Sequence, residues 1–490
     1  MKYAILLDRI ANAPELKEST LDEKGIRGVL EDAFVKVTFK VQTYVDKSLQ
    51  LKRLHGAKLG GLPPTWLDAS YQPDAKNSTN RTASLDQQRQ LYASAHVALV
   101  DPKFGDKFID DLVDWHDAFA KNFVINTDEG PVVFGAVEFA PDGSLAKQVP
   151  DSKANIRFTY AIEGSATLVR ALAQAAERNL AKRSEYLRKA HEIRDLVLSI
   201  GETFQKQFAD NLVPGRYFLL EKGHVPQGNP DRIEGLSHNN SQGYLLKGME
   251  TLAALDDTGT WSKRLDQLLR YIRTRQASGS GLLHEFDFKQ GGWDSSVIAN
   301  TSADLNLRWQ NQNNHETVIL GHTVAGIWEA PANLAARAGK RQELDALIQD
   351  FVVTMNRLGG IHKNGLPGNA FELIPNEIPP FDQKRWPEGS WQAELVWQFL
   401  LRAVETGLDL NTYKVQAEGT MITLERLLDK GLELHDSKMF DGLSYVHENG
   451  KELREHGRKD GDPVNHAAET MEALARALAQ LEAVPDRGGK

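Results

Sequence analysis

Apolar residues recur at helical spacing along most of the chain, and this periodicity is the feature that most constrains its fold. Serines precede or open several of the periodic runs, as helix-capping residues do. The pattern therefore predicts twelve helices. They span residues 28–55, 84–100, 104–122, 157–179, 183–209, 238–255, 259–276, 315–338, 341–357, 390–407, 417–435 and 465–483.

A slower repeat runs through the same sequence. Most helix pairs are followed by a glycine and a few β-type residues, with marker glycines at Gly130, Gly215, Gly281, Gly360 and Gly442. This predicts a repeated unit of two helices and a short β-hairpin. Such units cannot bury their apolar faces alone, so neighbouring units must stack.

The two end helices decide whether the stack closes. Residues 28–55 have no partner ahead of them and residues 465–483 have none behind, so pairing these two would close a ring. We therefore expect an all-α fold, an (α/α)6 barrel of six helical hairpins in a single domain over 1–490. Residues 56–83 would form a lid or insertion loop. An open array of helical hairpins is the alternative.

Composition narrows the possible partners. The 490 residues carry a formal net charge of -9, which disfavours binding to nucleic acid. There is no cysteine, so disulfides and thiolate metal sites are excluded. No apolar run approaches the length of a membrane span, and the N-terminal "YAILL" is too short for a signal peptide. We expect a cytoplasmic protein without a membrane partner, with a homodimer as its candidate oligomeric state.

The stretch "NQNNHETVILGHTVAGIWEA", 311–330, combines ionisable and apolar residues. If it is helical, one stripe carries His315, Ile319, His322 and Glu329, with Trp328 beside it. That face would be costly to bury dry, so it fits the wall of a wet pocket. A zinc site would need the second histidine one turn after the first, and here it lies two turns away. Histidines hydrogen-bonded in the core are the alternative.

A second polar stripe lies in "SWQAELVWQFLL". Trp391, Glu394 and Gln398 share one helix face. An indole beside a carboxylate and an amide suits a sugar, whose apolar ring face stacks on the indole while its hydroxyls meet the polar groups. A core tryptophan with Glu394 bridging two helices fits the pattern equally well.

A third stripe comes from "LDQQRQLYASAH". Arg89, Tyr92 and His96 share a face, and an inward arginine needs an anion, a sugar hydroxyl or an ion-pair partner. Two further histidines stand at predicted helix starts. His466 is in the first turn of the last helix, where its neutral form is favoured, and His238 is placed at a polar binding rim.

Four motifs resemble one enzyme family in content and order. The runs "QQRQLYASAHVAL", "GHTVAGIW", "WQAE" and "NHAAETMEAL" are similar to those of the N-acyl-D-glucosamine 2-epimerase superfamily. This superfamily includes mannose isomerases and cellobiose 2-epimerases and has an (α/α)6 barrel. The resemblance spans roughly residues 84–483.

The resemblance implies an acid/base mechanism without a cofactor. His322 and His466 would be the pair that removes and returns a proton next to the open-chain carbonyl, through an enediolate. Arg89 would steady the developing negative charge. The expected catalytic residues are His322, His466 and Glu394. The expected substrate-binding residues are Arg89, Trp391, Trp328, His238, Tyr244, His315 and Glu329, and no metal is expected.

Two positions depart from the family pattern. The family has a glutamate three residues after its first histidine, where this chain has Ala325, so Glu329 would have to substitute from a further turn away. The family commonly has a histidine in its third inner helix, where this chain has Tyr244 before "LLK" and His238 two turns earlier. These departures bear on the epimerase chemistry more than on the fold.

Three functions remain in competition. A small-carbohydrate isomerase or epimerase is the leading hypothesis. A polysaccharide lyase or glycoside hydrolase acting on uronate- or sugar-containing oligosaccharides is the first alternative, because either could use the same helical toroid. A non-enzymatic helical-hairpin binding scaffold is the second. The polar and aromatic stripes lie on the predicted inner helices, which favours the enzymes.

Overall fold

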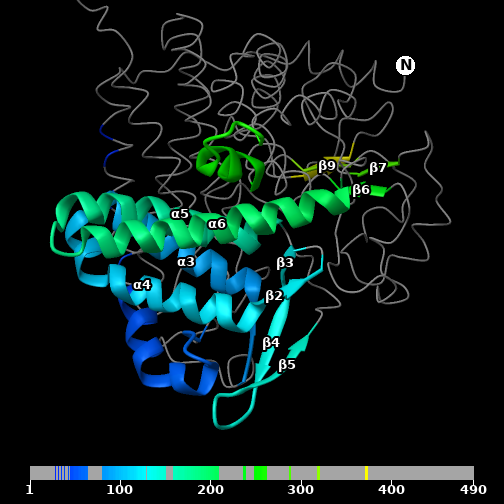
Figure 1. Ribbon diagram of the computed structural model, residues 1–490. Helices are drawn as coiled ribbons and strands as arrows, with labels where there is room; N and C mark the ends of the chain where they lie inside the picture. Colours follow the sequence, from blue (N-terminus) through cyan, green and yellow to red (C-terminus); the bar gives the residue numbers. More distant parts are fainter. Residues whose placement is uncertain are drawn as a thin grey trace, which may run out of the picture.

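The computed structural model describes most of residues 45–208 and several shorter segments beyond them (Figure 1). The described ranges are 45–64, 80–128, 130–149, 158–208, 236–238, 248–261, 286–288, 317–319 and 370–372, with single helical positions at 28, 31, 35, 38 and 42.

Four long helices dominate this part of the chain. They are α3 (Ser84–Val100), α4 (Pro102–Phe123), α5 (Phe158–Arg178) and α6 (Arg183–Phe208). Residues 45–55 and 248–255 are also helical, and a 3-10 turn, η1 (Gly56–Leu59), follows the first of these. The helices predicted at 84–100, 104–122, 157–179 and 183–209 are confirmed to within two residues at each end.

Local chemistry explains the sharp start of α4. Asp101 caps the helix, because its carboxylate accepts hydrogen bonds from the backbone amides of Lys103 at 3.0 Å and Phe104 at 3.3 Å. Pro102 follows in the first helical position, where its missing N–H costs nothing. The apolar stripe of α4, which includes Phe108, Leu112 and Trp115, is then buried.

The helices form an inner and an outer layer. All described side chains of α3 are buried or half-buried, whereas α4 and α6 each have an exposed face. Helix α3 packs against α4 and α5, and α5 packs against α6 (Figure 1). An added Cβ at Gly105 would lie 2.7 Å from the carbonyl oxygen of Ala98, so this glycine permits the close approach of α3 and α4.

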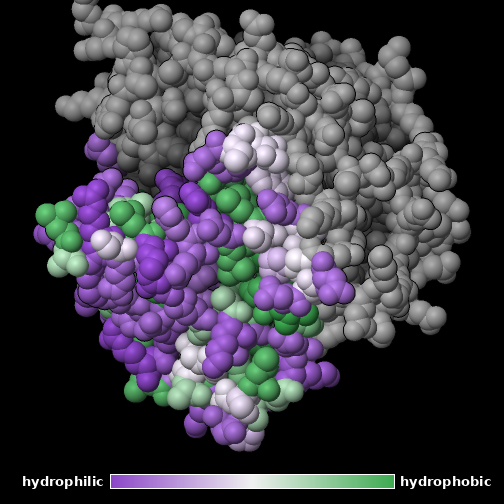
Figure 2. All heavy atoms as spheres, viewed as in Figure 1, coloured by the Kyte–Doolittle hydropathy of each residue, from purple (hydrophilic) through white to green (hydrophobic). Residues whose placement is uncertain are grey.

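Ion pairs between α4 and the α5–α6 hairpin follow one register. Arg178–Asp106, Lys182–Asp110 and Lys189–Asp117 each join residues 72 positions apart. The pairs are solvent-exposed, and the surface over these helices is largely hydrophilic (Figure 2). Exposed pairs stabilise little individually, so this ladder mainly reports how the two elements are aligned.

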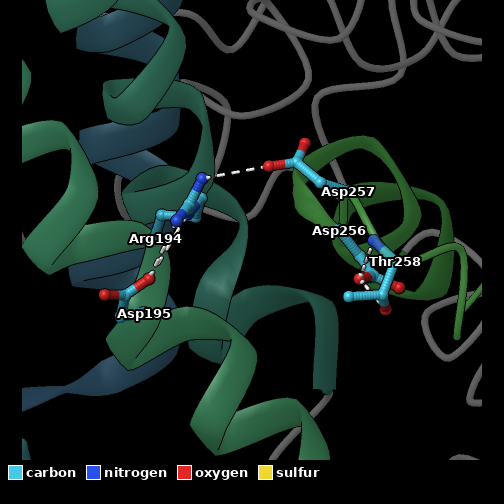
Figure 3. Close-up of polar contacts among 5 residues, drawn as sticks. All are labelled: Arg194, Asp195, Asp256, Asp257 and Thr258. Atoms are coloured by element: carbon cyan, nitrogen blue, oxygen red, sulfur yellow. Dashed lines mark hydrogen bonds and ion pairs between the residues drawn. The ribbon is translucent and has the colours of Figure 1, made fainter.

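Similar contacts link the outer layer to its neighbours on both sides. Arg53, in the helix over 45–55, pairs with Asp111 of α4. Arg194 of α6 reaches Asp257 at 3.4 Å, in the turn that follows the helix over 248–255 (Figure 3). Consecutive helical pairs are therefore joined around the outside, as a toroidal stack requires.

Short strands gather at the end where α3 begins and α4 ends (Figure 1). The strands are β1 (Arg81–Ala83), β2 (Val124–Thr127), β3 (Gly130–Val133), β4 (Ala136–Phe139), β5 (Leu145–Val149), β6 (Leu236–His238), β7 (Phe286–Phe288), β8 (Thr317–Ile319) and β9 (Ala370–Glu372). All described pairings are antiparallel, in the orders β1-β4-β5, β2-β3, β6-β7 and β8-β9.

One predicted hairpin is confirmed and the one after Gly281 is corrected, whereas those at Gly215, Gly360 and Gly442 lie outside the described residues. Strands β2 and β3 form a local hairpin whose second strand begins at Gly130. Strand β7 instead pairs with β6, and β9 with β8, across about fifty residues of chain in each case. Together with β1–β4, these pairs show one arrangement three times, which reveals a structural repeat that the sequence does not.

Two predicted helix starts are wrong, because in both places the chain forms a strand by pairing with a distant segment. The helix expected from 315 cannot include Thr317–Ile319, which is strand β8 paired with Ala370–Glu372. Its three β-branched residues favour a strand, and the partner strand supplies the backbone hydrogen bonds. Likewise His238, expected at a helix start, ends strand β6.

The predicted lid, 56–83, is attached to the body at both of its described ends. Leu59 and Leu62 are buried, and the Asn122 amide of α4 donates a hydrogen bond to the Gly60 carbonyl at 3.0 Å. At the other end, Arg81–Ala83 is strand β1. Residues 65–79 lie outside the described part. None of the helices that the structure describes is long and apolar enough to cross a membrane.

Candidate functional site

Two of the predicted site residues fall within the described part of the chain. Arg89 lies in α3, and the backbone of His238 ends strand β6. The remaining ones lie outside the described residues, so their positions stay predictions. They are His322, His466, Glu394, Trp391, Trp328, Tyr244, His315 and Glu329.

The predicted stripe on α3 is confirmed as one helix face. Arg89, Tyr92 and His96 are all buried, and the rings of Tyr92 and His96 stack with centroids 5.7 Å apart. A helix turns by about 100° per residue. Gln87 and Ala98 face α4. Arg89 comes two residues after Gln87, and His96 comes two residues before Ala98, so each is rotated by about 200° around the helix axis. The stripe therefore lies on the side of α3 opposite the outer helix.

Gln87 anchors the beginning of α3 to its surroundings. Its fully buried amide donates hydrogen bonds to the Pro63 carbonyl at 3.0 Å and to the Thr82 hydroxyl at 2.9 Å. Its oxygen accepts from the Trp115 indole N–H of α4 at 2.7 Å. One side chain thus satisfies three buried partners, as a polar group in a core must. The turn that carries Arg89 is held from the α4 side.

A second buried polar cluster, formed by Gln88, Ser165 and His116, joins three helices. The Gln88 amide donates to the Ser165 hydroxyl of α5 at 3.0 Å, and its oxygen accepts from the Ser165 backbone N–H at 3.0 Å. The same hydroxyl lies 3.1 Å from Nδ1 of His116 on α4. We call this cluster the three-helix junction.

The imidazole of the junction is electrically neutral near pH 7. Burial lowers the pKa of His116 to about 4, and the smaller opposing effect of the nearby Asp117 carboxylate does not offset it. A neutral ring can form the hydrogen bond between Nδ1 and the Ser165 hydroxyl without placing a charge between the helices. This histidine is therefore suited to a structural role rather than to proton transfer at neutral pH.

Gly164 lets the two inner helices come close beside Arg89. An added Cβ there would collide with the Gln88 carbonyl oxygen and lie 2.9 Å from the Tyr92 backbone nitrogen. Both are backbone atoms inside a helix, so neither can move aside cheaply. Helix α5 therefore contacts α3 at Gln88 and at Tyr92, before and after Arg89 in the chain.

We expect Gly164→Ala to lower the free energy of unfolding by about 1–3 kcal/mol, because the methyl group would overpack this crossing. Urea denaturation followed by circular dichroism measures the change. Gly28→Ala is the matched control, since nothing lies within 4 Å of a Cβ at that helical position. A Gly164→Ala protein as stable as the wild type would contradict the close approach.

Sequence reasoning missed the three-helix junction. Gln88, Ser165 and His116 carry no motif, and each appears in an ordinary helical run. One signal was present: "SLDQQRQLYASAH" places many polar residues in a helix with no exposed face among its described side chains. A helix that is polar yet buried must find its partners on neighbouring elements. No group of metal-ligating side chains occurs among the described residues.

The sequence matches no protein-family model and no curated protein. The structure, however, is similar to solved carbohydrate-active enzymes. A cellobiose 2-epimerase from Spirochaeta thermophila is 14% identical, with a TM-score of 0.59 over 95% of this chain and 100% of that chain. A D-mannose isomerase is 12% identical, with a TM-score of 0.52 over 89% and 97% of the two chains. An unsaturated glucuronyl hydrolase from Bacillus sp. GL1 is 11% identical, with a TM-score of 0.50 over 90% and 96%.

These likenesses establish the fold. The chain is an all-α (α/α)6 barrel, as the sequence predicts. A cellobiose 2-epimerase and a mannose isomerase are the kinds of enzyme that the four sequence motifs resemble, so the resemblance is confirmed at the level of fold.

Proposed function

We propose that this chain is a cofactor-independent sugar isomerase or epimerase of the N-acyl-D-glucosamine 2-epimerase superfamily. The observation that carries the proposal is the likeness in fold to a cellobiose 2-epimerase over nearly the whole of both chains. The four motifs support it independently, because they occur in the order of that superfamily along the same fold.

In the proposed mechanism, His322 and His466 share the proton transfers. One imidazole takes the proton from the carbon next to the carbonyl of the open-chain sugar, and the electron pair left behind forms an enediolate. The other returns a proton to carbon or to the carbonyl oxygen. Two groups with pKa values near neutrality suffice for this exchange.

The described face of α3 supports the role proposed for Arg89. Its guanidinium is buried on the helix side opposite α4, next to the stacked Tyr92 and His96 rings. A fixed positive charge in a site shielded from water stabilises an enediolate much more than it would in solution. The sugar ring and its hydroxyls would be bound by Trp391, Trp328 and Glu394. The surrounding substrate-binding residues would be His238, Tyr244, His315 and Glu329.

Deuterium exchange tests the reaction class directly. The protein is incubated in D2O with a panel of free aldoses and ketoses that includes cellobiose and mannose, and the sugars are analysed by NMR. We expect deuterium at the carbon next to the carbonyl, together with the epimer or isomer. A complete absence of incorporation across the panel would sink the proposal.

A hydrolase acting on uronate-containing oligosaccharides is the second candidate. The likeness to an unsaturated glucuronyl hydrolase over 90% of this chain favours it. Such an enzyme would consume the ultraviolet absorbance of an unsaturated uronate and release a reducing sugar whose carbon next to the carbonyl stays unlabelled. A lyase would instead create that absorbance from a uronate polymer. One set of incubations thus separates the three reactions.

A further inference from the structure

The polar contacts around Arg89 hold its helical turn from two sides at once. Gln87 binds α4 through Trp115, and Gln88 binds α5 through Ser165. All four side chains are essentially without solvent exposure. Arg89 is the next residue along α3, on the face that points away from α4.

Backbone packing restrains the same turn. The would-be Cβ of Gly164 lies closest to the Gln88 carbonyl oxygen and touches the Tyr92 nitrogen, so α5 meets α3 on both sides of Arg89 in the chain. Ser165, the next residue of α5, accepts one hydrogen bond from the Gln88 amide and donates another to its oxygen. The contact and the hydrogen bonds therefore act on one turn of α3.

We propose that the Gln88–Ser165–His116 junction is a positioning device, which sets the place of Arg89 relative to α5 and thereby its aim at the substrate. The inference rests on the proposed function for the identity of that substrate. None of the three junction residues needs to touch the sugar. Their effect passes through the backbone of α3, which they tie to α5 and, through His116, to α4.

The junction predicts a specific kinetic signature. Ser165→Ala removes the hydroxyl shared by Gln88 and His116, so Arg89 is held less firmly where the negative charge develops. We expect kcat to fall about 10-fold while KM changes little, because the lost interaction acts mainly in the transition state. Gln88→Met, which keeps the length of the side chain without its amide, should have the same effect.

A double-mutant cycle separates positioning from general loss of structure. In an Arg89→Met background, Ser165→Ala should lower kcat no further, since the charge to be positioned is already gone. Ser94→Ala is the matched control, because Ser94 is another buried serine of this layer whose hydroxyl bonds within α3, to the Gln90 carbonyl. Additive losses of kcat in the two backgrounds would overturn the proposal.

A readout without substrate keeps this test distinct from that of the reaction. In protein labelled with 15N-arginine, the Nε–H resonance of Arg89 is assigned by its loss in Arg89→Lys. We expect Ser165→Ala and Gln88→Met to shift or broaden this resonance, and Ser94→Ala to leave it in place. An unchanged resonance in both junction variants would refute positioning. If the wild type labels no sugar, the proposed function falls, and this measurement still decides the role of the junction.

Discussion

Replacing His322 with glutamine should lower the rate of sugar conversion by about 10²–10⁴-fold, the usual contribution of a positioned acid or base. Glutamine keeps polarity and similar bulk but cannot exchange a proton at neutral pH. The same loss is expected for His466→Gln. Conversion is measured by NMR on whichever sugar of the panel the wild type labels, with kcat and KM determined separately.

The form of the loss matters as much as its size. If the histidines transfer protons, kcat should fall while the sugar still binds, because each acts on the reacting atoms. His191→Gln is the matched control, since His191 is exposed on the outer helix α6. Full conversion by either the His322 or the His466 variant would remove that residue from the mechanism. Loss of activity in His191→Gln as well would point to a defect in the protein preparations.

The helices were predictable because their signals are local. Helix α3 spans Ser84–Val100 as expected, and α4 begins where an aspartate precedes a proline in the chain. An N-cap, a proline in the first turn and a repeated apolar face all lie within a few residues of one another. The closed arrangement followed from counting helices, since the two end helices lacked partners.

The long-range strand pairs could not be predicted, because the partner that makes each segment a strand lies far away in the chain. Thr317–Ile319 sits at the start of a run with helical periodicity, and only pairing with Ala370–Glu372 makes it a strand. Nothing within either segment identifies its partner across about fifty residues. This affected the predicted site, because the stripe through His315 and Ile319 assumed a helix that starts too early.

In the candidate site too, local features could be predicted and long-range contacts could not. Helical spacing alone placed Arg89, Tyr92 and His96 on one face, and the stacked rings agree. The three-helix junction needs residues from three helices, and no spacing rule joins Gln88 to Ser165 at a separation of 77 residues. Periodicity reveals which residues share a face, whereas the partner of a buried polar group must be read from the fold.

Acidification should destabilise the protein through His116, by about 3 kcal/mol between pH 6.5 and pH 4. The pKa of a free histidine is 6.5, and burial lowers that of His116 in the fold to about 4. Within this window the unfolded chain binds a proton that the folded chain does not. The free energy of unfolding therefore falls by about 1.4 kcal/mol for each unit of decreasing pH, and the loss is complete below pH 4. Above pH 6.5 the ring is neutral in both states and adds no pH dependence.

His116→Phe isolates this effect, because phenylalanine fills the buried site without titrating. Urea denaturation across the pH range should show a shallower slope between pH 4 and 6.5 than in the wild type, whereas His191→Gln on the exposed face of α6 should keep the full slope. Identical slopes in the wild type and His116→Phe would mean that the imidazole is not held neutral in the fold.

The same variant also tests the source of the pH dependence of activity. If the decline of activity in acid reflects protonation of the proposed His322–His466 pair, it should persist in His116→Phe, while a decline that moves with the variant would report unfolding instead.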